Sequence, residues 1–104
     1  MTKKVKYRVK TIELTANALL PRKYRSVFGR DLVTDMQKMA KDNADTTSLE
    51  NLLWIMLRDA GEDVGDNVEE WLESMEMLDV YQILPDVLDL WIANQHTTST
   101  PKKK

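Results

Sequence analysis

Several residue types on which protein chemistry often depends are scarce or missing in this chain. It has no cysteine and one histidine, His96, among 104 residues. Without cysteine, disulfides and thiolate metal sites are excluded. One imidazole cannot build a metal site alone, so we expect the His96 side chain to be solvated. The sequence also lacks a glycine-rich phosphate loop, a nucleophilic serine motif and an EF-hand pattern. We therefore expect no enzyme activity, no cofactor and no metal.

Long hydrophobic runs are also missing. The run "LLWIML" is far shorter than the roughly 20 residues that span a bilayer. The basic start "MTKKVKYRVK" is not followed by the apolar region of a secretion signal. The sequence therefore predicts a cytoplasmic protein with no membrane partner.

The composition is that of a folded protein. Hydrophobic residues make up 42% and charged residues 31% of the chain, which is ordinary for a globular domain. A chain of this length can bury one modest core. We expect a single folded domain.

Charge is unevenly distributed along the chain. Residues 1–30 hold nine Lys or Arg against one acid, whereas residues 59–89 hold eleven acids and no base. The basic end could bind an anionic partner, or the two ends could attract each other within one fold or between copies. We favour the second interpretation, because the acidic half would repel a nucleic acid lying across the domain. A small nucleic-acid-binding protein that uses the basic N-terminal arm is the alternative.

The N-terminal residues predict an extended arm. Val5, Tyr7 and Val9 alternate with basic residues, which is the period of a half-buried strand. One strand cannot make a sheet. It could pair with a neighbouring copy, lie over the helices as an arm, or be mobile.

Helical spacing dominates the rest of the chain. Thr15 is a plausible N-cap for a first helical turn, and Pro21 predicts either a fresh helix or a kink, with Gly29 as the stop. Further helices are expected over about 31–41, from Thr47 or Ser48 to Gly61, from Asp66 or Asn67 to Leu78, and from Ile83 onward with Pro85 in the first turn. The helix from Thr47 or Ser48 to Gly61 is apolar nearly all round over "LLWIML", so we expect it to be central.

The predicted fold class is therefore all-α. We expect a small bundle of four to five short helices with an extended N-terminal strand or arm and a loose C-terminal tail. The domain organisation is an arm over residues 1–14, a helical domain over 15–95 and a flexible tail over 96–104. The acids between Glu62 and Glu76 are expected to form a solvated helix face rather than a cation site.

Large apolar side chains suggest a partner. The chain has six methionines and three tryptophans, more than five short helices easily bury, and methionine suits surfaces that accept varied apolar partners. We expect self-association or a groove for a partner helix. The candidate partner-binding residues are Trp54, Met56, Trp71 and Met75.

A basic-aromatic segment lies between two apolar stripes. In "KYRSVFGRDL", residues 23–32, Tyr24 and Phe28 are four residues apart on one helical face, which favours a place in the core over stacking on nucleic-acid bases. The longer stretch "LTANALLPRKYRSVFGRDLVTDMQKM", residues 14–39, resembles the tail assembly chaperones of long-tailed phages and related prophages of Gram-positive bacteria. "NLLWIMLRDAG" and "LPDVLDLWIANQ" are also similar to later helices of that family, so the likeness covers most of residues 11–95. The matching signature positions, which we expect to build the fold, are Tyr24, Phe28, Gly29, Arg30, Asp31 and Leu32.

The resemblance implies a small helical protein that is not an enzyme. Such proteins are made during infection, act in the host cell cytoplasm and are absent from the mature virion. They bind the tape measure protein and keep it soluble while tail tube subunits are recruited, in many phages through a longer frameshifted form. The expected partners are the tape measure protein, the tail tube protein and further copies of the chain.

Overall fold

The N-terminal segment is a β-hairpin. The computed structural model describes residues 2–42 and 46–99, and within them β1 (Thr2–Tyr7) pairs antiparallel with β2 (Lys10–Thr15). The all-α prediction is therefore wrong, and the fold is a small α+β fold. The expected extended strand is present as β1, and its partner is the next segment of the same chain.

A two-residue loop, Arg8–Val9, joins the strands. Arg8 has φ 58°, a left-handed conformation that glycine or asparagine usually supplies in hairpins. Neither residue type is present, so the usual turn signal is missing. A weaker signal remains, because the buried apolar positions change from odd numbers, Val5 and Tyr7, to even numbers, Ile12 and Leu14. Such a change of phase requires a turn between them.

Six helices follow in the described part of the chain. They are α1 (Leu20–Phe28), α2 (Leu32–Asp42), α3 (Thr47–Asp59), α4 (Val68–Ser74), α5 (Met77–Tyr81) and α6 (Leu84–Ser99). Residues 100–104 of the predicted tail, and the side chain of His96, lie outside what the structure describes.

Local chemistry explains where α1 begins. Thr15 is the last residue of β2 rather than an N-cap, so that prediction is wrong. The side chain of Asn17 accepts a hydrogen bond from the Leu19 amide at 3.0 Å, and Pro21 lies in the first turn of α1, where a missing donor costs least. The fresh helix at Pro21 is thus confirmed over the kink.

The helix predicted from Asp66 or Asn67 to Leu78 is two helices in the structure, α4 and α5. Asn67, one of the two expected caps, caps α4, because its side-chain oxygen accepts a hydrogen bond from the Glu70 amide at 2.9 Å. The chain then becomes extended at Met75 (ψ 149°) and Glu76 (ψ 141°) before α5 starts. No glycine or proline marks this break, so the apolar spacing alone predicted a continuous helix to Leu78.

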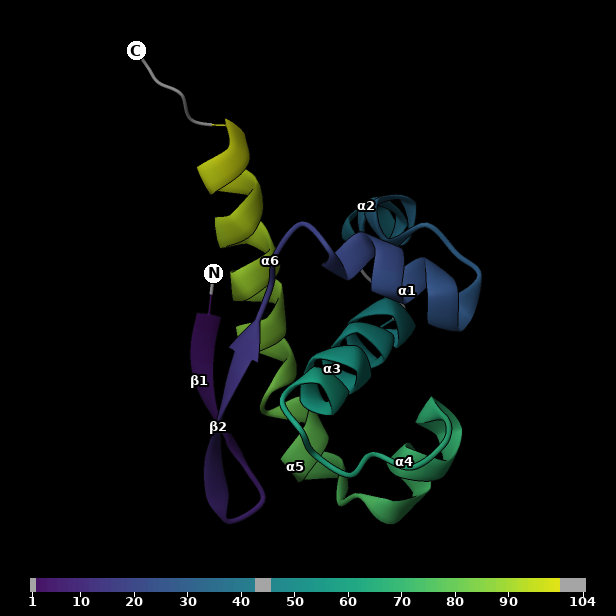
Figure 1. The fold of residues 1–104 in the computed structure, drawn as a ribbon, viewed down its shortest axis with the longest axis vertical. Helices are drawn as coiled ribbons and strands as arrows, with labels where there is room; N and C mark the ends of the chain where they lie inside the picture. The colour runs from purple at the N-terminus through teal and green to yellow at the C-terminus, as the bar shows by residue number, and fades with distance from the viewer. Residues whose placement is uncertain (1, 43–45, 100–104) are drawn as a thin grey trace.

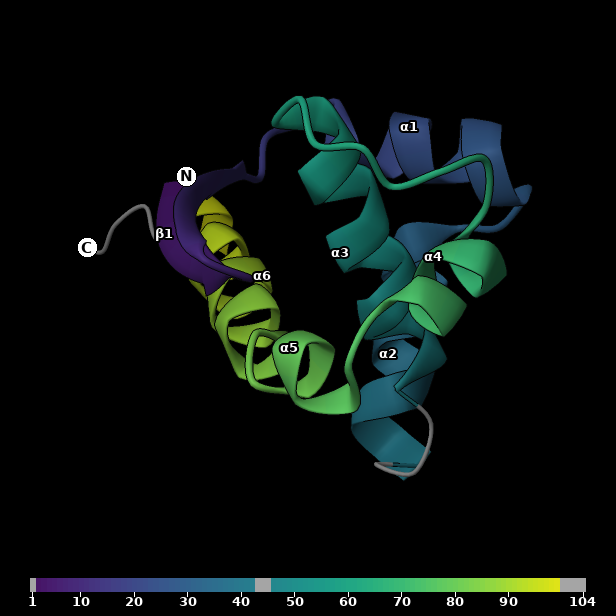
Figure 2. The same cartoon turned by 90° about the horizontal axis from the view of Figure 1, so that it is seen from below.

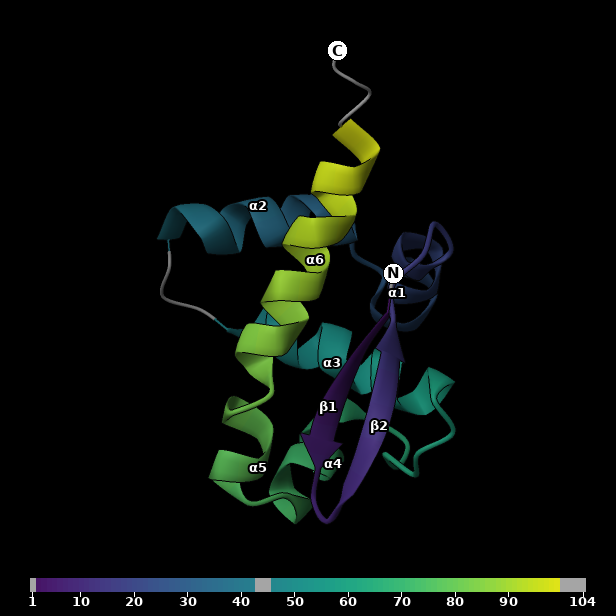
Figure 3. The same ribbon diagram turned by 90° about the vertical axis from the view of Figure 1, so that its left-hand side faces the viewer.

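Helix α3 lies in the middle of the fold and contacts α1, α2, α4, α6 and β2 (Figure 1). Its residues Leu49 and Leu52–Leu57 are all buried, which confirms the predicted central helix. The hairpin lies against α6 on one side of α3, with α1, α2 and α4 on the other (Figure 2). Strand β1 contacts α6 and β2 contacts α3, with the hairpin beside the lower part of α6 in Figure 3. Val5, Tyr7, Ile12 and Leu14 join the single core through the inner face of the hairpin.

Candidate functional site

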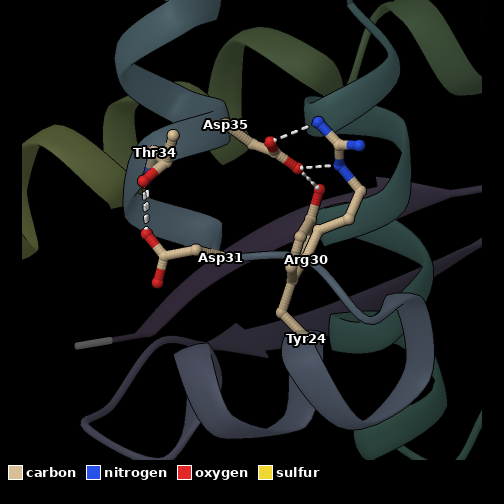
Figure 4. A network of polar contacts seen from close by, with 5 residues as sticks. All are labelled: Tyr24, Arg30, Asp31, Thr34 and Asp35. Carbon is tan, nitrogen blue, oxygen red and sulfur yellow. Dashed lines mark hydrogen bonds and ion pairs between the residues drawn. The ribbon is translucent and has the colours of Figure 1, made fainter.

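The segment that carries the family resemblance forms the junction of α1 and α2. Tyr24 is buried, and its hydroxyl donates to Asp35 Oδ2 at 2.9 Å. Arg30 donates to the same carboxylate twice, from Nε to Oδ2 at 2.7 Å and from Nη2 to Oδ1 at 2.8 Å. Figure 4 shows the phenol and the guanidinium converging on Asp35. The carboxylate therefore joins two helices and the loop between them.

The electrostatics of this junction follow from the contacts. Hydrogen bonds from Arg30 are the largest cause that holds the pKa of Asp35 below its ordinary value, although burial opposes them. Burial raises the pKa of Tyr24, while side chains of Asn51 and Ser48 on α3 favour its ionised form. A buried carboxylate that accepts hydrogen bonds from paired donors is a structural anchor.

The remaining signature residues complete the turn. Gly29 has φ 66° and donates its amide to the Arg25 carbonyl at 2.7 Å, which ends α1. Asp31 Oδ2 accepts from the Thr34 amide at 2.9 Å and from its hydroxyl at 2.6 Å (Figure 4), so it caps α2. These bonds from Thr34 lower the pKa of Asp31. The segment is thus a helix-to-helix corner.

Two aromatic rings and a leucine fix the corner to the core. The rings of Tyr24 and Phe28 are 4.8 Å apart, and Phe28 meets Trp54 edge-on at 6.2 Å. Leu32 is fully buried. Asp35 was not among the sequence-predicted residues. Its signal is an acid within the apolar stripe of Leu32, Met36 and Met39, five residues after an arginine.

The sequence-predicted partner-binding residues lie mostly inside the protein. Trp54, Met56 and Trp71 are buried, and Met75 is half-buried. Trp54 Nε1 donates to the Val64 carbonyl at 2.9 Å, and Trp71 Nε1 donates to the Tyr7 hydroxyl at 3.1 Å. The tryptophans therefore hold the α3–α4 loop and the hairpin in place. In this conformation their rings offer no surface to a partner.

A different set of apolar residues is exposed, on α5 and α6. Met77 is 70% exposed, Leu78 73% and Tyr81 47%. Pro85, Leu88 and Ile92 follow on α6 at spacings of three and four, so they lie on one face of that helix. Together with Met77, Leu78 and Tyr81 they form what we call the apolar stripe of α5 and α6. This surface could not be predicted from residue type alone, because packing decides which apolar side chains stay exposed.

An apolar groove adjoins this stripe where the first turn of α3 meets α5 and α6. Its volume is about 410 Å³, and its lining comprises Thr46, Leu49, Tyr81, Leu84, Pro85 and Leu88. Leu49 and Leu84 are buried and form its floor, whereas Leu88 is half-buried. We call it the α5–α6 groove. Its size is that of a site for a few apolar side chains.

Ion pairs connect the basic and acidic halves of the chain. Lys3 Nζ lies 3.4 Å from Asp86, and Lys10 Nζ lies 3.0 Å from Glu62. A third pair joins Lys23 and Asp59 at 2.8 Å. The uneven charge is therefore partly neutralised within one fold, although such surface pairs each contribute little to stability.

A larger, more polar pocket of about 550 Å³ lies at the hairpin tip. The loop after α3 and helix α4 line its other side, including Glu62, Asp63 and Glu70. Lys10 and Glu62 already pair there, and Arg8 Nη2 donates to the Met75 sulfur at 3.0 Å. Two of its charged groups, Lys10 and Glu62, thus neutralise each other.

Comparisons with known proteins give no family assignment. No protein-family model, no curated protein and no solved structure matches this chain. Within residues 2–42 and 46–99, no cluster of three or more histidine, cysteine or acidic side chains has metal-binding geometry. Across the same residues, every helix is too short or too polar to span a bilayer.

Proposed function

We propose that this chain is a phage tail assembly chaperone that binds the tape measure protein and is not an enzyme. The resemblance of residues 14–39 to that family motivates the proposal. One structural observation carries it further, namely the apolar stripe and groove on α5–α6. A chaperone for a long apolar helical client needs exposed apolar contacts on a soluble surface, and helix-in-groove binding supplies them.

The proposed mechanism is shielding of the client. Apolar side chains of the tape measure protein lie in the α5–α6 groove, so they leave water and are kept from aggregation. The acidic helices α4 to α6 keep the complex soluble. We further propose that several copies cover one client, that a longer frameshifted form recruits tail tube subunits, and that the protein acts in the host cytoplasm and is absent from the virion.

Co-expression tests the proposal. The client fragment comes from the very long open reading frame expected downstream of this chain's gene. We expect the fragment to remain in the soluble fraction and to co-purify with the chain, and to pellet with an unrelated small acidic protein. If the fragment is equally insoluble and unbound in both cases, the proposal fails.

The nucleic-acid alternative is favoured by one observation. Lys4 and Lys6 lie exposed on the outer face of the hairpin, and neither makes an ion pair with a described residue. This function predicts retention of DNA or RNA that falls steeply with salt and is lost when Lys3, Lys4, Lys6 and Arg8 are neutralised. Elution of the chain without nucleic acid at low salt would exclude it.

A further inference from the structure

The α5–α6 groove has an acidic border. Glu50 lies beside it, since its Oε2 is 3.3 Å from the Thr46 hydroxyl and 3.5 Å from the Tyr81 hydroxyl. On α6, Asp89 is four residues after Pro85 and therefore lies near it on the helix surface, on the side where Lys3 of β1 is 3.6 Å from its carboxylate, and its side chain is 64% exposed. Lys3 pairs with Asp86 as well as with Asp89, so two carboxylates share one lysine on this side of α6. A ligand in the groove therefore meets apolar side chains in the centre and Glu50 beside Tyr81, and a longer ligand also meets the net negative charge at Asp86 and Asp89.

This distribution of charge selects among possible occupants. A second copy that presents the same α5–α6 surface brings its own acids, and like charges facing each other oppose the contact. An acidic or neutral apolar helix gains nothing from the border. A helix with an apolar stripe and flanking Lys or Arg satisfies both features of the surface.

We infer that the α5–α6 groove binds a basic amphipathic helix, and that such segments of the tape measure protein are what the chaperone selects. The inference rests on the proposed function for the identity of the client, whereas the chemistry of the groove is tested independently of it. The apolar stripe supplies affinity, and Glu50 and Asp89 supply the preference for basic flanks.

Two fluorescent helical peptides with the same leucine stripe, one flanked by Lys and one by Glu, test the chemistry in an anisotropy titration with the full chain. We expect the Lys peptide to bind about tenfold more tightly at low salt, because each exposed charge pair contributes a modest amount. The preference should fall as salt is raised. Equal affinities for the two peptides would overturn the inference.

Substitutions locate the site. Glu50→Gln with Asp89→Asn should bring the affinity of the Lys peptide close to that of the Glu peptide while the stripe stays intact. Leu88→Gln should weaken binding of the Lys peptide about tenfold or more. Leu19→Gln, which changes an exposed leucine at the start of α1 that does not line the groove, should leave binding unchanged. Because Leu88 also packs against the core, Tyr81→Ser provides a second, more exposed change. Full peptide affinity in both groove variants contradicts the proposed site.

The same variants separate this inference from the proposed function. If wild-type chain and Leu88→Gln both keep the tape measure fragment soluble, the groove assignment is wrong and the chaperone function stands. If wild-type chain binds the Lys peptide but does not bind the fragment, the groove chemistry stands and the function fails. Self-association of the chain that Leu88→Gln abolishes would show that a second copy occupies the groove and would overturn the inference.

Discussion

The hydrogen bond between Tyr24 and Asp35 allows a quantitative test of the helix corner. Tyr24→Phe removes the buried hydroxyl, and Asp35→Ala removes the carboxylate that accepts from both Tyr24 and Arg30. A hydrogen bond to a charged group contributes about 1.5–3 kcal/mol, and a buried donor without an acceptor costs about 1–3 kcal/mol. These values bound the expected change in the free energy of unfolding.

The surroundings of Tyr24 narrow that range. Ser48 and Asn51 lie close enough to its oxygen to favour its ionised form, so the hydroxyl can form other bonds when Asp35 is removed. Alanine also favours the helix over aspartate by up to about 0.7 kcal/mol. We therefore expect each single variant to lose about 1.5–2 kcal/mol, with the double variant about 1 kcal/mol more stable than the sum predicts.

Urea unfolding followed by tryptophan fluorescence measures all four proteins of this cycle. Tyr81→Phe is the matched control, since the Tyr81 hydroxyl is exposed and its contact with Glu50 is long, at 3.5 Å. The control should lose less than about 0.5 kcal/mol. Additive effects of Tyr24→Phe and Asp35→Ala would refute the claim that Asp35 joins the two helices through Tyr24.

Three further predictions concern local structure. Gly29→Ala should destabilise the fold by about 1–2 kcal/mol because φ 66° is left-handed; an unchanged urea midpoint would contradict this. Asn67→Ala should lower the free energy of unfolding by about 1 kcal/mol through loss of the α4 cap, whereas the adjacent Asp66→Ala should change it little. Equal losses of stability in urea would show that Asn67 does not cap α4. The pKa values of Asp35 and Asp31 lie below the ordinary value of 3.8, so the stability they supply is complete above about pH 5 and lost as pH falls through the folded values. The free energy of unfolding of Asp35→Ala should thus fall less steeply below pH 4 than that of wild type. Parallel stability curves for the two proteins would contradict this role of Asp35.

Helix spacing predicted much of this fold because the helices bury continuous stripes. The central position of α3, the cap at Asn67 and the stop at Gly29 each follow from a few neighbouring residues. Those features depend on local chemistry, which a sequence displays directly.

The hairpin and the α4–α5 break could not be predicted in the same way. Arg8 adopts the left-handed turn without a glycine, and Met75 becomes extended without a proline. A tertiary contact joins the two segments, since Arg8 Nη2 donates to the Met75 sulfur at 3.0 Å. Such contacts, between residues 67 apart in the chain, leave no local pattern.

The candidate site depended on burial rather than residue type. Trp54 and Trp71 are the largest apolar side chains in the predicted partner set, and each finds a hydrogen-bond acceptor inside the fold. The exposed stripe instead comprises ordinary residues such as Leu78 and Tyr81 on a short helix that the sequence did not predict. Which apolar residues are left over for a partner is known only once the core is complete.

Hydrogen exchange of the chain bound to a tape measure fragment tests the central claim most directly. We expect slower amide exchange in Met77–Tyr81 of α5 and in the first two turns of α6, with exchange in α1 unchanged. Failure to form a complex, or protection at the α1–α2 corner with none on α5 and α6, would contradict it.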